Sequence, residues 1–169
     1  LHTQIDLRGP IPTCIHITGA RQHDVGWLDN LLFEAGAFYL MDRGYMDFVR
    51  LALIAKTGAF FVTRAKTNLQ FTRHYSLPVE RFTGLQSDHV GKPALEKSRK
   101  AFPMPLRRVK YADPETAKEF VFLTNNLEIP ALTVAMLYKL RWRIELFFRW
   151  IKGHLRIKHY YGTSPNAVK

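Results

Sequence analysis

The chain has 169 residues, of which 47% are hydrophobic and 13% aromatic, enough apolar material for a packed core, and this excludes a mainly disordered chain. Lysine and arginine outnumber aspartate and glutamate by 25 to 14, and the net charge of +11 favours a polyanionic partner, of which nucleic acid is the commonest. No apolar run approaches the roughly 18 residues of a membrane span, and a single cysteine, Cys14, excludes an internal disulfide and a cysteine-rich zinc site.

The first 64 residues alternate between strand-like and helix-like patterns. Apolar periodicity and turn signals predict strands at 1–7 and 13–18, a helix at 24–33, a strand at 37–41, a helix at 46–56 and a strand at 59–64. The first two strands are separated by a short turn and should form a hairpin. Because strands and helices alternate, we expect an α/β fold with a mixed sheet.

The segment from about 66 to 124 has a different composition. It is rich in proline, glycine and charged residues, so we expect short strands and loops that form an insertion on the core fold. Two clearer strand patterns lie in its last part, at 107–111 and 119–124. Pro130 then opens a long helix that is expected to continue to about residue 155.

This predicted helix carries a polar stripe. At about 100° per residue, six polar side chains fall within about 80° of arc: Tyr138, Arg141, Glu145, Arg149, Lys152 and Arg156. The opposite side is apolar, and we expect it to be core; it holds Leu140, Ile144, Phe147, Phe148, Ile151 and Leu155.

Glu145 is the one acid within this basic stripe, and two interpretations are open. It can form intrahelical ion pairs with Arg141 and Arg149 on an ordinary solvated surface. Alternatively, its carboxylate can hold a divalent cation while the neighbouring bases bind phosphate groups.

Asp42 directly follows the apolar run at 37–41, whose continuous pattern is typical of a strand buried on both faces. In open α/β sheets, functional sites collect at the carboxyl ends of strands. A turn with an Asp42–Arg43 pair is the simpler alternative. Two carboxylates, a large positive charge and no cluster of cysteine or histidine ligands would together suit magnesium or manganese bound with phosphate oxygens.

The spacing Y-x2-R-x3-E-x6-K, formed by Tyr138, Arg141, Glu145 and Lys152, resembles the YREK signature of insertion-sequence DDE transposases. The neighbouring LTNN at 123–126 is also similar to the sequence that precedes this signature in the family. The YLMDRGY segment at 39–45 is similar to the region of that family's second catalytic aspartate. HITGARQHDV and FFVTRAK are similar as well, so the resemblance covers nearly the whole chain.

The resemblance implies an RNase H-like mixed sheet flanked by helices, with a β-rich insertion before the last long helix. It makes Asp42 the second and Glu145 the third of three catalytic carboxylates. In such transposases these carboxylates hold two Mg²⁺ or Mn²⁺ ions. One ion activates a water or a 3′ hydroxyl, and the other stabilises the leaving oxygen during in-line attack on a DNA phosphodiester.

The same resemblance implies double-stranded DNA, at transposon ends and at the target, as the partner. Tyr138, Arg141 and Lys152 would contact phosphates around the transposon end. Further phosphate candidates, by charge and position alone, are Arg43, Arg149 and Arg156. Such transposases usually act as dimers on paired ends, so a homodimer is expected, in the bacterial cytoplasm at the nucleoid and without a membrane.

The first catalytic aspartate is expected on a strand before the opening hairpin. Asp6 closes a strand one element too late, and Asp24 is better interpreted as a helix cap. We therefore interpret residues 1–169 as a partial catalytic domain that lacks this strand and the C-terminal region, and that is inactive alone. The alternatives are a non-catalytic nucleic-acid-binding remnant of a decayed transposase and, less well supported, a ribonuclease-H-like RNA hydrolase.

Overall fold

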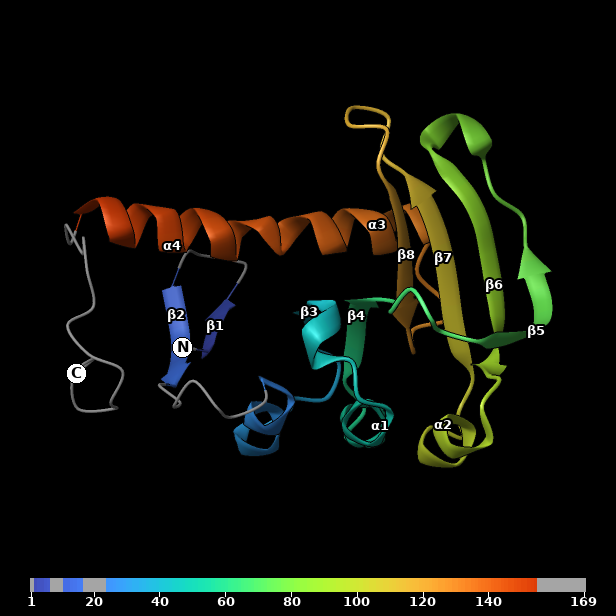
Figure 1. The fold of residues 1–169 in the computed structure, drawn as a ribbon, viewed down its shortest axis with the longest axis horizontal. Helices are drawn as coiled ribbons and strands as arrows, with labels where there is room; N and C mark the ends of the chain where they lie inside the picture. The colour runs from blue at the N-terminus through green and yellow to red at the C-terminus, as the bar shows by residue number, and fades with distance from the viewer. Residues whose placement is uncertain (1, 7–10, 17–23, 155–169) are drawn as a thin grey trace.

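The computed structural model describes residues 2–6, 11–16 and 24–154, which form a six-stranded mixed sheet flanked by helices and a separate two-stranded hairpin (Figure 1). This confirms the predicted mixed α/β class. In spatial order the large sheet consists of β3 (Phe38–Met41), β4 (Phe60–Arg64), β8 (Glu119–Thr124), β7 (Leu106–Ala112), β6 (Leu85–Pro93) and β5 (Phe71–Leu77). The hairpin pairs β1 (His2–Asp6) with β2 (Ile11–His16), as the sequence predicts.

The strands β3 and β4 run parallel, and every other pair in the described part of the large sheet is antiparallel. The helix α1 (Phe48–Lys56) makes the crossover between the two parallel strands. Its N-terminus is capped by Asp47, whose carboxylate accepts a hydrogen bond from the Arg50 amide. Gly58, at φ 77°, follows its C-terminus in the left-handed conformation that glycine adopts without strain.

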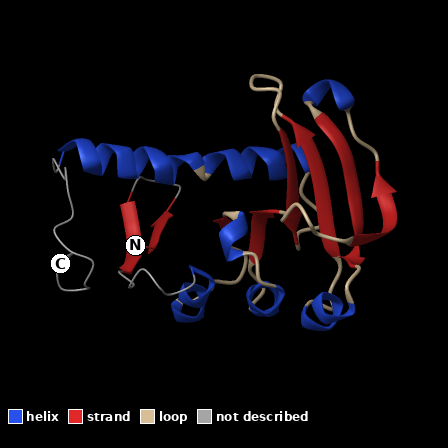
Figure 2. Ribbon diagram, viewed as in Figure 1, coloured by secondary structure: helices blue, strands red, loops and turns tan. Residues whose placement is uncertain are grey.

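Helices lie around the large sheet (Figure 2), and the buried residues form two separate hydrophobic cores, one on each face of the sheet. On one face, Phe61 and Leu123 pack with α1 and with Phe102, which follows the short helix α2 (Glu96–Ala101). On the other face, Val62 and Phe122 pack against α3 (Ala131–Leu140). The strands β4 and β8 therefore contribute adjacent residues to opposite cores, as the pleat requires.

The segment predicted as short strands and loops is more regular than expected. It contains β5, β6, α2, β7 and β8, and β6 alone has nine residues. The prolines that suggested irregularity lie where they cost no ladder hydrogen bond: Pro93 ends β6, while Pro103 and Pro105 lie between α2 and β7. That this segment is an insertion stays a prediction.

The predicted helix at 24–33 is wrong in type and extent. The structure has a 3-10 helix, η1 (Asp24–Asn30), and no helical turn beyond it before β3. Gly26 weakens the first turn, and Leu32, expected on the apolar stripe, is 92% exposed. The next helix also begins later than predicted, at Phe48, because the 3-10 turn η2 (Arg43–Tyr45) follows β3 first.

The predicted helix at 130–155 is observed as two helices, α3 and α4 (Trp142–His154), that meet at Arg141. The Arg141 amide bonds to the Tyr138 carbonyl, and the Ile144 amide bonds to the Arg141 carbonyl. These tighter i→i−3 bonds mark a local 3-10 junction. None of the described helices has the length and apolar character that crossing a bilayer requires.

The prediction that the apolar side of this segment is core is wrong for α4. Leu140, Ile144, Phe147 and Phe148 are only half-buried and belong to neither core. The reason is that α4 extends away from the large sheet, so that sheet does not cover it (Figure 1). The side chain of Ile151 and all of Leu155 lie outside the described residues.

Asp113 ties α3 to the turn between β7 and β8. Its carboxylate accepts hydrogen bonds from the Thr116 hydroxyl at 2.7 Å and from Lys139 Nζ at 2.9 Å. These two partners hold the pKa of Asp113 below its ordinary value of 3.8. A lowered folded-state pKa stabilises the protein above pH 3.8, and this stabilisation is lost as the pH falls through the folded-state pKa.

We therefore expect Asp113→Asn to flatten the acid limb of the stability profile. Urea midpoints measured between pH 7 and pH 2 should fall less steeply in the variant, because it has no carboxylate to protonate at this position. Glu115→Gln, an exposed neighbour in the same turn, is the matched control and should keep the wild-type slope. Parallel profiles for wild type and Asp113→Asn would contradict the assignment.

Candidate active site

Asp42 lies immediately after β3, at the carboxyl end of the strand, as the sequence predicts. It caps η2: its Oδ1 accepts a hydrogen bond from the Arg43 amide at 2.8 Å. From the neighbouring parallel strand β4, the Thr63 hydroxyl donates a hydrogen bond to the Asp42 carbonyl at 3.4 Å. The backbone at Asp42 is thus fixed by the neighbouring strand as well as by its own turn.

Tyr138 reaches Asp42 from α3. Its hydroxyl donates to Asp42 Oδ1 at 3.2 Å, across 96 residues of sequence. The tyrosine is only 7% exposed, and its ring lies 4.8 Å from the Phe122 ring, centroid to centroid. Burial, followed by the negative charge of Asp42, raises the pKa of Tyr138, so the hydroxyl remains a protonated donor.

Arg141 continues this chain of contacts one turn further along. Its guanidinium carbon lies 5.5 Å from the centre of the Tyr138 ring, and its Nη2 donates to Glu145 Oε1 at 2.7 Å. Its Nε is buried, and no described residue forms a hydrogen bond with it. Burial lowers the pKa of Arg141, but the bond to Glu145 and the nearby acidic groups raise it by more, so the side chain stays charged.

The structure therefore joins four of the predicted site residues: Asp42 to Tyr138, Tyr138 to Arg141, and Arg141 to Glu145. The Arg141–Glu145 contact is also the i,i+4 ion pair of the simpler interpretation. Among the described ion pairs, none joins Glu145 to Arg149, which is exposed on α4. The side chain of Lys152 and all of Arg156 lie outside the described residues.

The donor set of Asp42 and Glu145 suits a hard cation. In the described contacts each carboxylate uses one oxygen, Oδ1 of Asp42 and Oε1 of Glu145, and its second oxygen accepts no hydrogen bond. Carboxylate oxygens are the ligands that Mg²⁺ and Mn²⁺ prefer. The part of the chain with described side chains contains no group of three or more potential ligands.

A basic cavity lies beside Asp42. It has a volume of about 490 Å³ and is lined by Arg43, Gly44, Lys66, Thr67 and Asn68. Arg43 and Lys66 are exposed, and neither forms an ion pair in the described part of the chain. The sequence pointed to Arg43 and to the basic residues at 64–66, but not to Thr67 and Asn68, which no spacing motif marks.

The LTNN segment positions the start of α3, a role that the sequence alone does not reveal. Asn125 Oδ1 accepts a hydrogen bond from the Phe61 amide of β4 at 2.9 Å. Asn126 Oδ1 accepts from the amides of Glu128 and Ile129 at 3.0 and 2.9 Å. The two asparagines thus hold the β8–α3 turn against the sheet. Because α3 begins at this turn, they help to set the position of Tyr138 on that helix.

Comparison with known proteins agrees with this fold. Residues 1–169 match the family model described as a transposase DDE domain. A Sinorhizobium fredii protein named as a transposase is 38% identical across 100% of the chain and 48% of its own length. A Geobacillus stearothermophilus protein named as a transposase of insertion sequence element IS5377 is 28% identical, over 99% of the chain and 44% of its own length.

A Synechocystis protein named as a transposase of another insertion sequence element is 26% identical, over 97% of the chain and 46% of its own length. The chain therefore spans about half the length of these relatives. Transposases of the DDE family generally use divalent metal ions and act on DNA. The whole-chain match and the mixed sheet flanked by helices agree on one assignment: the chain belongs to the DDE-domain transposases.

Proposed function

We propose that this chain forms part of the catalytic domain of an insertion-sequence transposase, which hydrolyses phosphodiesters at element ends and transfers the strands to target DNA. The observation that carries the proposal is the bond between Asp42, at the end of β3, and Tyr138 on α3, because Tyr138 contacts Arg141, and Arg141 in turn pairs with Glu145. The YREK assignment of Tyr138, Arg141, Glu145 and Lys152 is part of the proposal.

Asp42 and Glu145 would hold Mg²⁺ or Mn²⁺ through their second oxygens. When bound, such ions would supply Lewis-acid stabilisation of the charge that develops during in-line attack on a phosphodiester. Tyr138 orients the Asp42 carboxylate by occupying Oδ1, which leaves Oδ2 available. Arg141 similarly holds Glu145 through Oε1 alone.

The basic residues around this edge would bind the DNA backbone. Arg43 and Lys66 line the cavity beside Asp42, and Arg149 is exposed on α4. Arg141 forms an ion pair with Glu145. It would contact a phosphate only if its guanidinium bound the phosphate and the Glu145 carboxylate together. Lys152 and Arg156 remain candidates by sequence. A dimer on paired ends, at the bacterial nucleoid, belongs to the same proposal.

The experiment that tests the function measures cleavage of labelled DNA carrying the element's ends by the full-length protein, with Mg²⁺, with Mn²⁺ and with a chelator. Metal-dependent nicking at the ends supports the proposal. Binding without cleavage under all conditions would instead favour the non-catalytic nucleic-acid-binding alternative. The Arg141–Glu145 ion pair supports that alternative, because it gives Glu145 a role that needs no metal. Cleavage of RNA and not of DNA would favour the ribonuclease alternative.

Tyr138→Phe is expected to slow cleavage by about 10–100-fold, the usual effect of removing a partner that orients a metal ligand. The phenylalanine keeps the ring contact with Phe122 but removes the donor to Asp42. The measurement is the single-turnover cleavage rate at saturating metal, together with the metal concentration at half-maximal rate. The matched control is Tyr39→Phe, whose hydroxyl accepts from the Glu34 amide and should not affect the rate. A wild-type rate in Tyr138→Phe would remove the positioning role.

Arg43→Ala is expected to weaken DNA binding equally for all sequences and to reduce the slope of log affinity against log salt by about one. The reason is that an exposed arginine that contacts a phosphate displaces about one condensed counterion from the DNA. Fluorescence anisotropy at several salt concentrations measures the slope. Arg81→Ala, which removes an exposed arginine in η3 (Arg81–Thr83), should leave the slope unchanged.

A further inference from the structure

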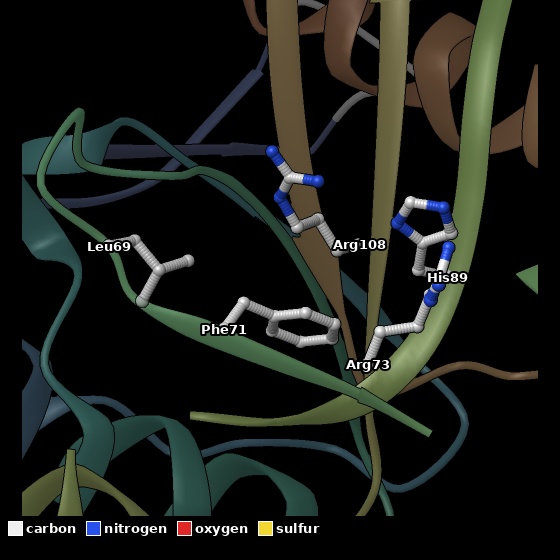
Figure 3. Close-up of a pocket in the computed structure, with 5 residues that line it drawn as sticks. All are labelled: Leu69, Phe71, Arg73, His89 and Arg108. Carbon is white, nitrogen blue, oxygen red and sulfur yellow. The ribbon is translucent and has the colours of Figure 1, made fainter. Parts of the chain in front are cut away.

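A second basic cavity lies over the outer strands of the sheet (Figure 3). It has a volume of about 330 Å³ and is lined by Leu69, Phe71, Arg73, His89 and Arg108. Leu69 comes from the β4–β5 connection, Phe71 and Arg73 from β5, His89 from β6 and Arg108 from β7. Four segments therefore converge on one hollow, and three of the five side chains are basic.

The strand register places this cavity on the face opposite α3. His89 pairs directly with Arg108, and Arg108 pairs with Leu123 of β8. Residues directly opposite one another across strands point to the same face. Leu123 belongs to the core beneath α1, whereas α3 packs on the other face. The cavity is thus separated by the sheet from the Asp42–Tyr138 contact.

The positive charge in this cavity is not compensated by the protein. None of the five lining residues is acidic, and in the described part of the chain neither arginine forms an ion pair. The nearest acid in sequence, Asp88, points to the other face, where Arg107 occupies both of its oxygens at 2.9 and 2.6 Å. Two guanidinium groups and an imidazole that share one hollow without a carboxylate form a site for an anion.

The shape of the cavity suits a phosphate carried on a sugar. Phe71 and Leu69 supply an apolar wall beside the basic groups. Residue 91 of β6 is a glycine where β5 passes close: a Cβ there would lie 2.0 Å from the Thr72 carbonyl oxygen and 3.0 Å from the Phe71 ring. Guanidinium groups bind phosphate oxygens in a forked geometry, and the ring can pack against a deoxyribose.

The β4–β5 connection links this cavity to the one beside Asp42. Lys66, Thr67 and Asn68 line the first cavity, and Leu69 and Phe71, next along the chain, line the second. A DNA strand that follows this connection would pass from the basic groups near Asp42 to those on the outer strands. This continuity favours a polymer of phosphates over a small free anion.

We propose that Arg73, His89 and Arg108 bind one backbone phosphate of the DNA, as a contact separate from the Asp42 site. The proposal rests on the proposed function in one respect: it takes DNA as the ligand. Such a contact positions the DNA and carries no sequence preference of its own.

The first test is DNA binding by Arg73→Gln and Arg108→Gln in the full-length protein, with chelator present so that no cleavage occurs. Loss of one phosphate contact should reduce the salt slope by about 0.9 in either variant, and the double variant should lose no more than that. Arg99→Gln, an exposed arginine of α2 outside the cavity, is the matched control. Urea unfolding checks that each variant keeps its fold.

The outcomes separate this proposal from the proposed function. If the wild type fails to bind DNA, the proposed function itself is wrong. If the wild type binds but both cavity variants keep its salt slope, the phosphate site is wrong and the proposed function stands. Slopes that fall additively, by one unit for each arginine, would show two independent surface contacts and would also overturn the single site.

A second readout follows the His89 ring by NMR. Without ligand its pKa lies below the ordinary 6.5, because burial and then the charges of Arg73 and Arg108 lower it, against a smaller opposing effect of Asp88. A short duplex should raise this pKa, since a bound phosphate favours the imidazolium. A rise with inorganic phosphate and none with duplex would overturn the DNA assignment, and no rise with either would overturn the site.

Discussion

Glu145→Gln is expected to abolish DNA cleavage while the fold and DNA binding remain. Glutamine has nearly the same shape and keeps an oxygen to accept from Arg141, but it lacks the negative charge that makes a carboxylate a strong ligand for Mg²⁺. We expect the cleavage rate to fall by about 100-fold or more, since even outer-shell partners of metal ligands contribute about 10–100-fold. Single-turnover cleavage in the full-length protein, with DNA affinity measured separately, gives the result.

A second ion pair in the chain provides the control. Glu96 and Lys100 form another i,i+4 pair, on α2, at 2.7 Å. Pairs of this kind contribute only about 0.3–0.5 kcal/mol to the free energy of unfolding. Glu96→Gln should therefore lose little stability and keep wild-type cleavage, whereas Glu145→Gln should lose cleavage while urea unfolding shows that it remains folded. Full activity in Glu145→Gln would reduce Glu145 to an ion-pair partner and favour a nucleic-acid-binding role.

Arg107→Met is expected to cause a large loss of stability. Arg107 and Asp88 are 3% and 2% exposed, and the guanidinium donates to both carboxylate oxygens. Methionine removes the charge and leaves the Asp88 carboxylate buried without its partner. Breaking a buried pair in this way costs about 3–5 kcal/mol of unfolding free energy. Urea denaturation at neutral pH measures the loss.

The double variant Asp88→Leu/Arg107→Met separates the unpaired charge from the loss of packing. It removes both charges, so it should be more stable than Arg107→Met alone. It still leaves the Ile129 carbonyl without the Arg107 Nη1 that donates to it at 2.6 Å. A loss of less than about 1 kcal/mol in Arg107→Met, comparable to that of an exposed pair, would show that Asp88 is effectively solvated.

This buried pair also bears on the candidate site. Ile129 lies directly before the residue that caps α3, so Arg107 fixes the point where that helix leaves the sheet. A shift of α3 would move the Tyr138 hydroxyl relative to Asp42. Variants of Arg107 that remain folded at low temperature should therefore show slower cleavage as well as lower stability.

The sequence by itself determined the α/β class and the main elements near the site. The apolar run at 37–41 predicts β3 and places Asp42 at its end, because a strand buried on both faces needs a continuous apolar segment. The residues at 130–155 carry the helical spacing of Arg141 and Glu145, which are observed as an ion pair. These features depend on local periodicity, which a single sequence contains. The metal and DNA roles of the site residues remain predictions.

Only the tertiary structure decided what each side chain contacts. A helical wheel places Tyr138 on a polar stripe, yet the residue is buried because α3 packs on the sheet at that point, whereas α4 extends away from the sheet. Likewise, the Asp88–Arg107 pair and the cavity around His89 depend on the register of β5, β6 and β7. Strand register and helix docking arise from contacts between distant segments, so no local pattern specifies them.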